Sequence, residues 1–215
     1  MRIVSVLAIG ALSASASASV FTDATADLFD NSLSNLDIAS VEMNDNGVDL
    51  TISITTASYQ NWTKYMIMFN TVAGGATSNA WSRPIDLAGT DIDYFIGSWV
   101  DAPSSNSQFV AYETGAWNWG AASTFTNSVS GNTVSWTVSL ASLGLSAGQT
   151  MWFDVATSGG GSNDPGVDHL SRSDMATTGW GTPSVAGAFA SYTVTPAPGA
   201  IALLGLVGLA ARRRR

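Results

Sequence analysis

A period of two in hydrophobic and polar positions dominates the central part of the chain. From Val48 to Thr55, apolar side chains at even positions alternate with Asp, Thr and Ser at odd positions. Successive side chains of an extended chain point to opposite faces, so this segment predicts a strand with one buried face. It follows Asp45-Asn46-Gly47, and Asn-Gly accepts the positive φ angles of a tight hairpin turn. We therefore expect residues 41–43 to form the partner strand.

Several other short segments have the composition of strands. Residues 65–69 are apolar at every position, which is typical of a central strand covered on both faces. Further strands are predicted at 93–100, 108–114, 134–138, 150–157 and 189–194, and a helical turn at 140–145. Short strands with Gly and Asn turns and no long amphipathic helix indicate an all-β fold. We expect a single β-sandwich, jelly-roll or immunoglobulin-like, over residues 19–195.

The two ends of the chain differ from the centre. Met1 and Arg2 precede an apolar stretch at 3–12 and alternating Ser and Ala at 13–18. This pattern predicts a signal helix cleaved after Ala16 or Ala18, the alternative being a short buried helix. At the other end, residues 199–211 carry no charge and precede four arginines. A helix of that length spans about 20 Å, so it predicts a short apolar helix that crosses a membrane only marginally.

The C-terminal segment also contains a recognisable arrangement of motifs. Pro196-Ala197-Pro198, the apolar run with Leu203-Leu204-Gly205-Leu206, and the arginine cluster 212–215 together resemble the PEP-CTERM sorting signal of Gram-negative bacteria. The resemblance implies processing by an exosortase and delivery to the cell envelope, outer surface or extracellular matrix. We therefore divide the chain into a signal peptide (1–18), a β-sandwich domain (19–195) and a sorting tail (196–215). An ordinary C-terminal membrane anchor is the alternative for the tail.

Charge and composition exclude several classes of function. All 16 acidic residues lie between Asp23 and Asp174, where the only bases are Lys64, Arg83 and Arg172. Three bases against 16 acids leave this region with a net charge of −13, which disfavours a nucleic-acid partner. The chain has no Cys and one His, so thiolate zinc, iron–sulfur, disulfide and multi-histidine sites are excluded. Hard cations with oxygen ligands, such as calcium, remain compatible.

Aspartates are densest at the start of the predicted domain. Asp23, Asp27, Asp30 and Asp37 occur within 15 residues, and such carboxylates repel one another unless they are protonated, solvated or bridged by a cation. We expect Asp23, Asp27 and Asp37 to bind a structural Ca²⁺. The alternative is that they are solvated loop acids. A second acidic loop contains Asp154, Asn163, Asp164 and Asp168.

The sequence contains no arrangement that predicts catalysis. His169 lies beside Asp168 and close to Ser171, but the chain has no G-x-S-x-G nucleophile motif. The two glutamates, Glu42 and Glu113, fall in or near predicted strands, and Asp91 and Asp93 would share one face of a strand. Neither pair is placed to bracket a glycosidic bond. We therefore expect no catalytic residues and no enzymatic activity, with a glycoside hydrolase as the least favoured alternative.

Aromatic residues provide the main indication of a ligand. Trp136 lies on an apolar strand face and is expected in the core, together with at least one of Trp152 and Phe153. Other tryptophans lie beside small polar residues and can stack on sugar rings. The candidate glycan-binding residues are Trp117, Trp119, Trp62, Trp81 and Trp180. We expect Trp117 and Trp119 to project from one side of an extended segment. The alternative is a structural or adhesive matrix protein whose aromatics are core residues.

Residues 21–55 have a second resemblance. The early aspartates, Leu36-Asp37-Ile38 and the strand at 48–54 are similar to the opening of DOMON-like and family 9 carbohydrate-binding sandwiches. That resemblance implies an acidic loop that supports a cation and a non-catalytic sandwich that binds polysaccharide. Segments 61–67, 81–85, 96–101 and 153–155 resemble a group of PEP-CTERM exported proteins, which brings no activity and no catalytic residue.

Overall fold

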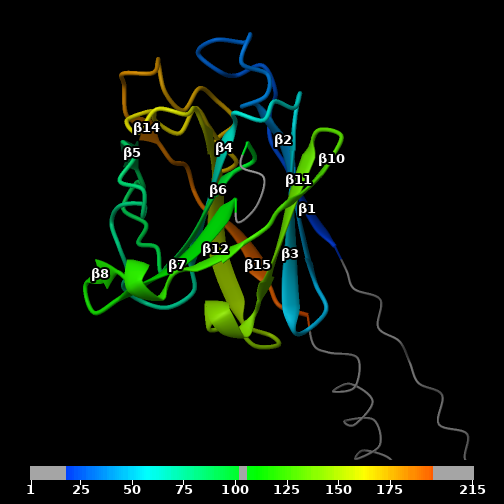
Figure 1. Ribbon diagram of the computed structural model, residues 1–215, viewed down its shortest axis with the longest axis vertical. Coiled ribbons are helices and arrows are strands. Elements are labelled where there is room, and N and C mark those ends of the chain that lie inside the picture. Colours follow the sequence, from blue (N-terminus) through cyan, green and yellow to red (C-terminus); the bar gives the residue numbers. More distant parts are fainter. Residues whose placement is uncertain (1–17, 102–105, 196–215) are drawn as a thin grey trace, which may run out of the picture.

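The computed structural model describes residues 18–101 and 106–195 (Figure 1). Within these ranges the only helices are two short 3₁₀ helices, η1 (Trp119–Ala121) and η2 (Ala141–Leu143), and η2 lies in the predicted helical turn. The predicted all-β class is confirmed. No helix in the described part of the chain has the length and apolar character needed to cross a membrane. The predicted signal helix and C-terminal apolar helix lie outside the described residues.

The first sheet contains five antiparallel strands in the order β1–β2–β3–β11–β10. Their bounds are β1 (Ser19–Thr22), β2 (Ile38–Asp45), β3 (Asp49–Thr56), β11 (Thr133–Ser139) and β10 (Ser128–Ser130). The β2–β3 pair is the predicted hairpin, with Gly47 at a φ of 83° in its turn. Buried and half-buried residues alternate along β3, so one face of this sheet is apolar, as the period of two predicts.

The second sheet has the order β13–β12–β4–β6–β7–β8, and β15 and β9 pair additionally with β12 and β7. The bounds are β4 (Lys64–Asn70), β6 (Tyr94–Trp99), β7 (Ser107–Glu113), β8 (Ala116–Trp117), β9 (Ser123–Phe125), β12 (Thr150–Ser158), β13 (Asp168–His169) and β15 (Ala190–Thr193). β4 lies inside the sheet, and every residue from Tyr65 to Phe69 is buried. The predicted central strand is therefore confirmed. Neither large sheet closes into a barrel.

The main core joins the two large sheets. Ile52 and Trp136 from the first sheet belong to one buried cluster with Phe69 and Phe153 from the second. The indole Nε1 of Trp136 donates to the Ser107 hydroxyl at 3.0 Å, which satisfies its polar atom inside the core. The predicted core position of Trp136 is confirmed, and of Trp152 and Phe153 it is Phe153 that lies in the core. Burial between two sheets explains the apolar alternation.

The other face of the second sheet is also covered. Residues 76–92 pack over Met66, Met68 and Phe95 in a separate buried cluster. This covering segment contains β5 (Ile85–Asp86), which pairs in parallel with β14 (Ser184–Val185). The second cover explains why β4 is apolar on both faces, whereas β3 is apolar on one.

The two ends of β12 have different surroundings. Its last residues pair with β13, and its first residues pair with β15. The loop 23–37, drawn in blue, and the yellow-to-orange segment that follows β12 lie together at the top of Figure 1. Parts of the chain that are distant in sequence therefore meet at the end of β12 that contains Ser158.

Candidate metal centre

The loop between β1 and β2 is folded back on itself by an aspartate. Asp37, next to the start of β2, accepts a hydrogen bond through Oδ2 from the backbone N–H of Ala26 at 2.9 Å. Ala26 has a positive φ of 65°, which turns the chain back toward Asp37. The backbone N–H of Asp23 donates to the Ala39 carbonyl at 3.2 Å. These bonds hold Asp23 and Asp27 near the first residues of β2.

Asp168 joins this loop from the second sheet. Asp168 in β13 lies opposite Thr157 in β12. Its Oδ2 accepts from the backbone N–H of Ile38 at 2.6 Å. Its Oδ1 accepts from the backbone N–H of His169 at 2.8 Å. Asp27, Asp37 and Asp168 each offer a carboxylate oxygen, and these atoms lie within 4.8 Å of one another. With the neighbouring Asp23, they are called the acidic cluster below.

Part of the acidic cluster is buried without hydrogen-bond partners. Four carboxylate oxygens, Asp23 Oδ2, both of Asp27 and Asp37 Oδ1, are buried and unpaired among the described residues. The Asp37 residue is only 5 % exposed and Asp168 only 1 %. Buried carboxylates normally have partners, because an unpaired buried charge is costly. Protonation, an ordered water molecule or a cation would each satisfy these oxygens.

The electrostatics of the acidic cluster favour protonation when no cation is present. Burial, together with the nearby charges of Asp23 and Asp27, raises the pKa of Asp168 to about 8. Burial likewise raises the pKa of Asp23 to about 7, with contributions from Asp27, Asp154 and Asp37. The pKa values of Asp27 and Asp37 are also raised by burial. A bound cation would reverse these shifts, because it favours the ionised carboxylates.

The ligand set of the acidic cluster is chemically specific. It contains only carboxylate oxygens, and hard cations such as Ca²⁺ prefer such ligands. Of the three predicted residues, the structure brings Asp27 and Asp37 together with Asp168, and Asp23 lies near enough for its charge to act on Asp168. Sequence reasoning missed Asp168, which it grouped with the second acidic loop. No local signal could have found it, since its partner Ile38 is 130 residues away in the sequence.

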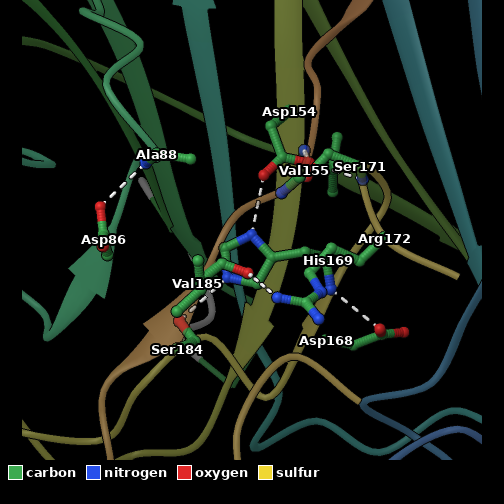
Figure 2. A network of polar contacts seen from close by, with 11 residues as sticks. Asp86, Ala88, Asp154, Val155, Asp168, His169, Ser171, Arg172, Ser184 and Val185 are labelled. Carbon is green, nitrogen blue, oxygen red and sulfur yellow. Dashed lines mark hydrogen bonds and ion pairs between the residues drawn. The ribbon is translucent and has the colours of Figure 1, made fainter. Parts of the chain in front are cut away.

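A second buried array lies beside the acidic cluster (Figure 2). Asp154 Oδ2 and His169 Nδ1 are 2.7 Å apart, and His169 Nε2 and Ser184 Oγ are 3.0 Å apart. Asp154 Oδ1 also accepts from the backbone N–H groups of Val155 and Ser171. A neutral imidazole with its proton on Nδ1 donates to Asp154 and accepts from Ser184, which satisfies all three side chains.

This array has the contact order of a Ser–His–Asp triad but not its accessibility. Asp154, His169 and Ser184 are all 0 % exposed. A Cβ added to Gly166 would lie 2.2 Å from His169 Nε2, so the backbone itself packs against the ring. A nucleophile must reach its substrate, and Ser184 is enclosed. The hydrogen bonds of this array therefore join β12, β13 and β14.

The structure places the predicted glycan-binding tryptophans in different regions. Trp62 is half-buried against the small cluster of Leu28, Leu36 and Val167. Trp81 packs on Phe95 with ring centroids 5.4 Å apart. Trp180 is 38 % exposed and contacts the Phe29 ring edge-on. Trp62 and Trp180 thus lie at the same small cluster, which Trp180 reaches through Phe29, whereas Trp81 packs against the buried cluster of Met66, Met68 and Phe95.

Trp117 and Trp119 do not continue one extended segment. Trp117 ends β8, whereas Trp119 begins η1, so the geometry predicted for this pair is wrong. Trp117 packs against Phe95 and Tyr112, and its Nε1 donates to the Ser78 carbonyl at 3.2 Å. Trp119 is 43 % exposed. The turn at Asn118, whose side chain accepts from the Ala121 N–H, separates the two indoles.

Comparisons with protein-family models, with curated proteins and with solved structures found no match for this chain.

Proposed function

We propose that this chain is an exported, non-catalytic carbohydrate-binding β-sandwich of jelly-roll or immunoglobulin-like type, stabilised by a Ca²⁺ ion. The observation that carries the proposal is the acidic cluster. Its four unpaired buried oxygens and the buried Asp168 form an all-oxygen site in a chain with a strong excess of acids. Asp23, Asp27, Asp37 and Asp168 would hold the ion, which would join the loop 23–37 to the second sheet.

Calcium binding is tested by thermal unfolding of the full chain in chelator, Ca²⁺ and Mg²⁺. A ligand that binds only the folded state stabilises it by mass action, by about 2.7 kcal/mol when its free concentration is a hundred times Kd. We expect the unfolding temperature to rise with Ca²⁺ concentration, and equilibrium dialysis to give one bound ion per chain. A melting temperature that is unchanged by chelation and by added Ca²⁺ overturns the metal assignment.

Carbohydrate binding is supported by indoles on the surface of the domain. Trp119, Trp152 and Trp180 are each more than one-third exposed, and exposed aromatic rings are suited to stacking on sugars. The enclosed Ser184 and the buried His169 support a non-catalytic role. A glycan-array screen of the purified chain tests this part of the proposal, and hydrolysis of any bound glycan would contradict it.

A structural or adhesive matrix protein is the second candidate. It is favoured by the packing of Trp62, Trp81 and Trp117, which contact buried clusters. Failure to bind any glycan, with Ca²⁺ stabilisation intact, would favour this candidate over the first.

Export is supported by the terminal segments, whose residues 1–17 and 196–215 lie outside the described structure. The resemblance to a PEP-CTERM tail favours passage through the membrane, processing by an exosortase and a final position in the envelope or matrix. Intact-mass measurement of protein from its native host is expected to show neither terminal segment. A mature chain that still carries Arg212 to Arg215 would instead identify a simple membrane anchor.

A further inference from the structure

An open cleft lies at the end of β12 opposite the acidic cluster. Its volume is about 680 Å³, within the usual range for small-ligand sites. Two aromatic and four polar residues in its lining carry the argument: Trp152, Phe189, Asn70, Thr71, Thr90 and Asp91. They come from β4, β12, the approach to β15 and the turns that follow β4 and β5.

Strand register creates the floor of the cleft. Trp152 in β12 lies directly opposite Asn70 in β4 and Ser191 in β15. Residues directly opposite in antiparallel strands project from the same face of the sheet. The indole, the carboxamide and the hydroxyl therefore form one row across three strands. Trp152 is 47 % exposed, while the adjacent Phe153 is fully buried on the other face.

The walls of the cleft are held by hydrogen bonds away from its opening. Asp93 Oδ2 accepts from the backbone N–H groups of Thr71 at 2.7 Å and Val72 at 3.0 Å. Ala76 and Ile92 pair through two backbone hydrogen bonds of 2.8 and 2.9 Å, which close the loop behind the wall. Such bonds hold a binding loop in place before the ligand arrives, which lowers the entropy lost on binding.

Two polar side chains in the cleft have no partners in the part of the chain that the structure describes. In residues 18–101 and 106–195, the half-buried side chains of Asn70 and Asp91 make no hydrogen bond or ion pair. An amide and a carboxylate provide both donors and acceptors beside an exposed indole. Sugars require this combination, because they present C–H faces together with hydroxyl groups.

We infer that the cleft of Trp152 and Asn70 binds a neutral saccharide, with the indole stacked on a sugar ring. Asn70 and Asp91 bond its hydroxyls. Asp91 and the net charge of −13 over residues 23–174 disfavour anionic sugars. The inference rests on the proposed carbohydrate-binding function and assigns it to a site different from Trp117 and Trp119.

Calorimetric titration of the full chain with neutral hexasaccharides tests the assignment. The probes are cellohexaose, xylohexaose, mannohexaose and laminarihexaose, all measured in the presence of Ca²⁺. Stacking on an aromatic ring corresponds to a loss of about fivefold to a hundredfold in affinity when the ring is removed. We expect Trp152→Ala to weaken binding of the preferred probe within that range. Trp119→Ala tests the competing site, since its indole is 43 % exposed but lies beside β7 and outside the cleft, and the cleft assignment expects its affinity to be unchanged.

A second variant separates binding from folding. Asn70→Ala removes a half-buried carboxamide that makes no hydrogen bond or ion pair among the described residues. We expect its melting temperature to stay close to that of the wild type, while binding weakens about threefold to tenfold.

Each remaining outcome points to one conclusion. If the wild type binds a probe and both Trp152→Ala and Asn70→Ala retain its affinity, the cleft assignment is wrong and the proposed function stands. An equal loss in Trp119→Ala also overturns the cleft. If the wild type binds none of the four probes, the cleft assignment fails, and the glycan-array screen then decides the carbohydrate-binding function.

Discussion

Two neighbouring groups of buried aspartates have opposite surroundings. Asp154 is fully buried, and both its oxygens accept hydrogen bonds, from His169 and from the backbone of Val155 and Ser171. In the acidic cluster, by contrast, four buried oxygens have no partner among the described residues. Both groups lie at one end of the second sheet, and the charge of Asp154 contributes to the raised pKa of Asp23.

The hydrogen bonds of Asp154 come from the protein itself, whereas the acidic cluster contains carboxylate oxygens for which the described residues provide no hydrogen-bond donor. A buried charge with a complete set of partners stabilises a unique arrangement of the chain, and removing one partner is then costly. Buried carboxylates without partners favour protonation or a cation. The surroundings of Asp154 therefore predict sensitivity to mutation but not to calcium. For the acidic cluster we expect stability to depend on calcium and to depend less on the substitution of one carboxylate.

The largest effect is expected from His169→Ala. The substitution leaves Asp154 Oδ2 without its partner in a fully buried position and opens a cavity. Breaking a buried pair in this way costs about 3 to 5 kcal/mol. We expect this loss of unfolding free energy in urea denaturation, and the same loss in Ca²⁺ and in chelator.

The control for His169→Ala is the nearby ion pair Arg172–Asp174, which is largely solvent-exposed on the Asp174 side. Arg172→Ala is expected to change stability by about 1 kcal/mol or less. A His169→Ala variant that is no less stable than this control would contradict the structural role assigned to the array.

Asp37→Asn is expected to have the next largest effect. The variant keeps an oxygen that can accept from the Ala26 N–H, but it loses one charge of the acidic cluster. The wild type should gain about 2.7 kcal/mol at a hundredfold excess of Ca²⁺ over Kd, and the variant much less. In chelator the variant should be at least as stable as the wild type, since mutual repulsion is relieved. Asp30→Asn, at an exposed aspartate, is the control that should respond like the wild type.

The pH dependence of stability is expected to change sign with calcium. In chelator, folding raises the pKa of Asp23 from 3.8 to about 7 and that of Asp168 from 3.8 to about 8. The folded state then holds protons that the unfolded state releases, so stability present below about pH 4 is lost as pH rises through about 7 to 8. Saturating Ca²⁺ should reverse the slope, because protons compete with the ion.

Melting temperatures between about pH 5 and about pH 8 test this prediction in both conditions. Parallel slopes in chelator and in Ca²⁺ would show that no cation binds at these carboxylates.

Local patterns predicted the strands well. The period of two placed β3 and its hairpin partner, and the uniformly apolar segment 65–69 identified a strand covered on both faces. Both signals depend only on neighbouring residues and on the pleat of the backbone. Three of the four aspartates of the acidic cluster lie in one short loop, so the sequence could also indicate them.

Features that depend on tertiary packing were not predictable. Asp168 reaches the acidic cluster through pairing with β12 and a hydrogen bond to Ile38, and nothing near Asp168 in the sequence specifies either contact. Alternation showed that Trp152 and Phe153 face opposite sides, but not which side would be covered. Phe153 is buried against the first sheet, whereas residues 76–92 cover the opposite face and leave Trp152 exposed.

The smallest effect is expected from Ser184→Ala. The substitution removes one hydrogen bond, to His169 Nε2 at 3.0 Å, and leaves the imidazole bonded to Asp154. Loss of a neutral hydrogen bond of this kind costs about 1 kcal/mol, which urea denaturation resolves. The Ser184 hydroxyl is enclosed, so a fluorophosphonate probe should label neither the wild type nor the variant. Labelling of the wild type that Ser184→Ala abolishes would instead show that the array opens to substrate. The hydrogen-bonded array of Asp154, His169 and Ser184 would then be the closed state of a hydrolase active site and not a purely structural network.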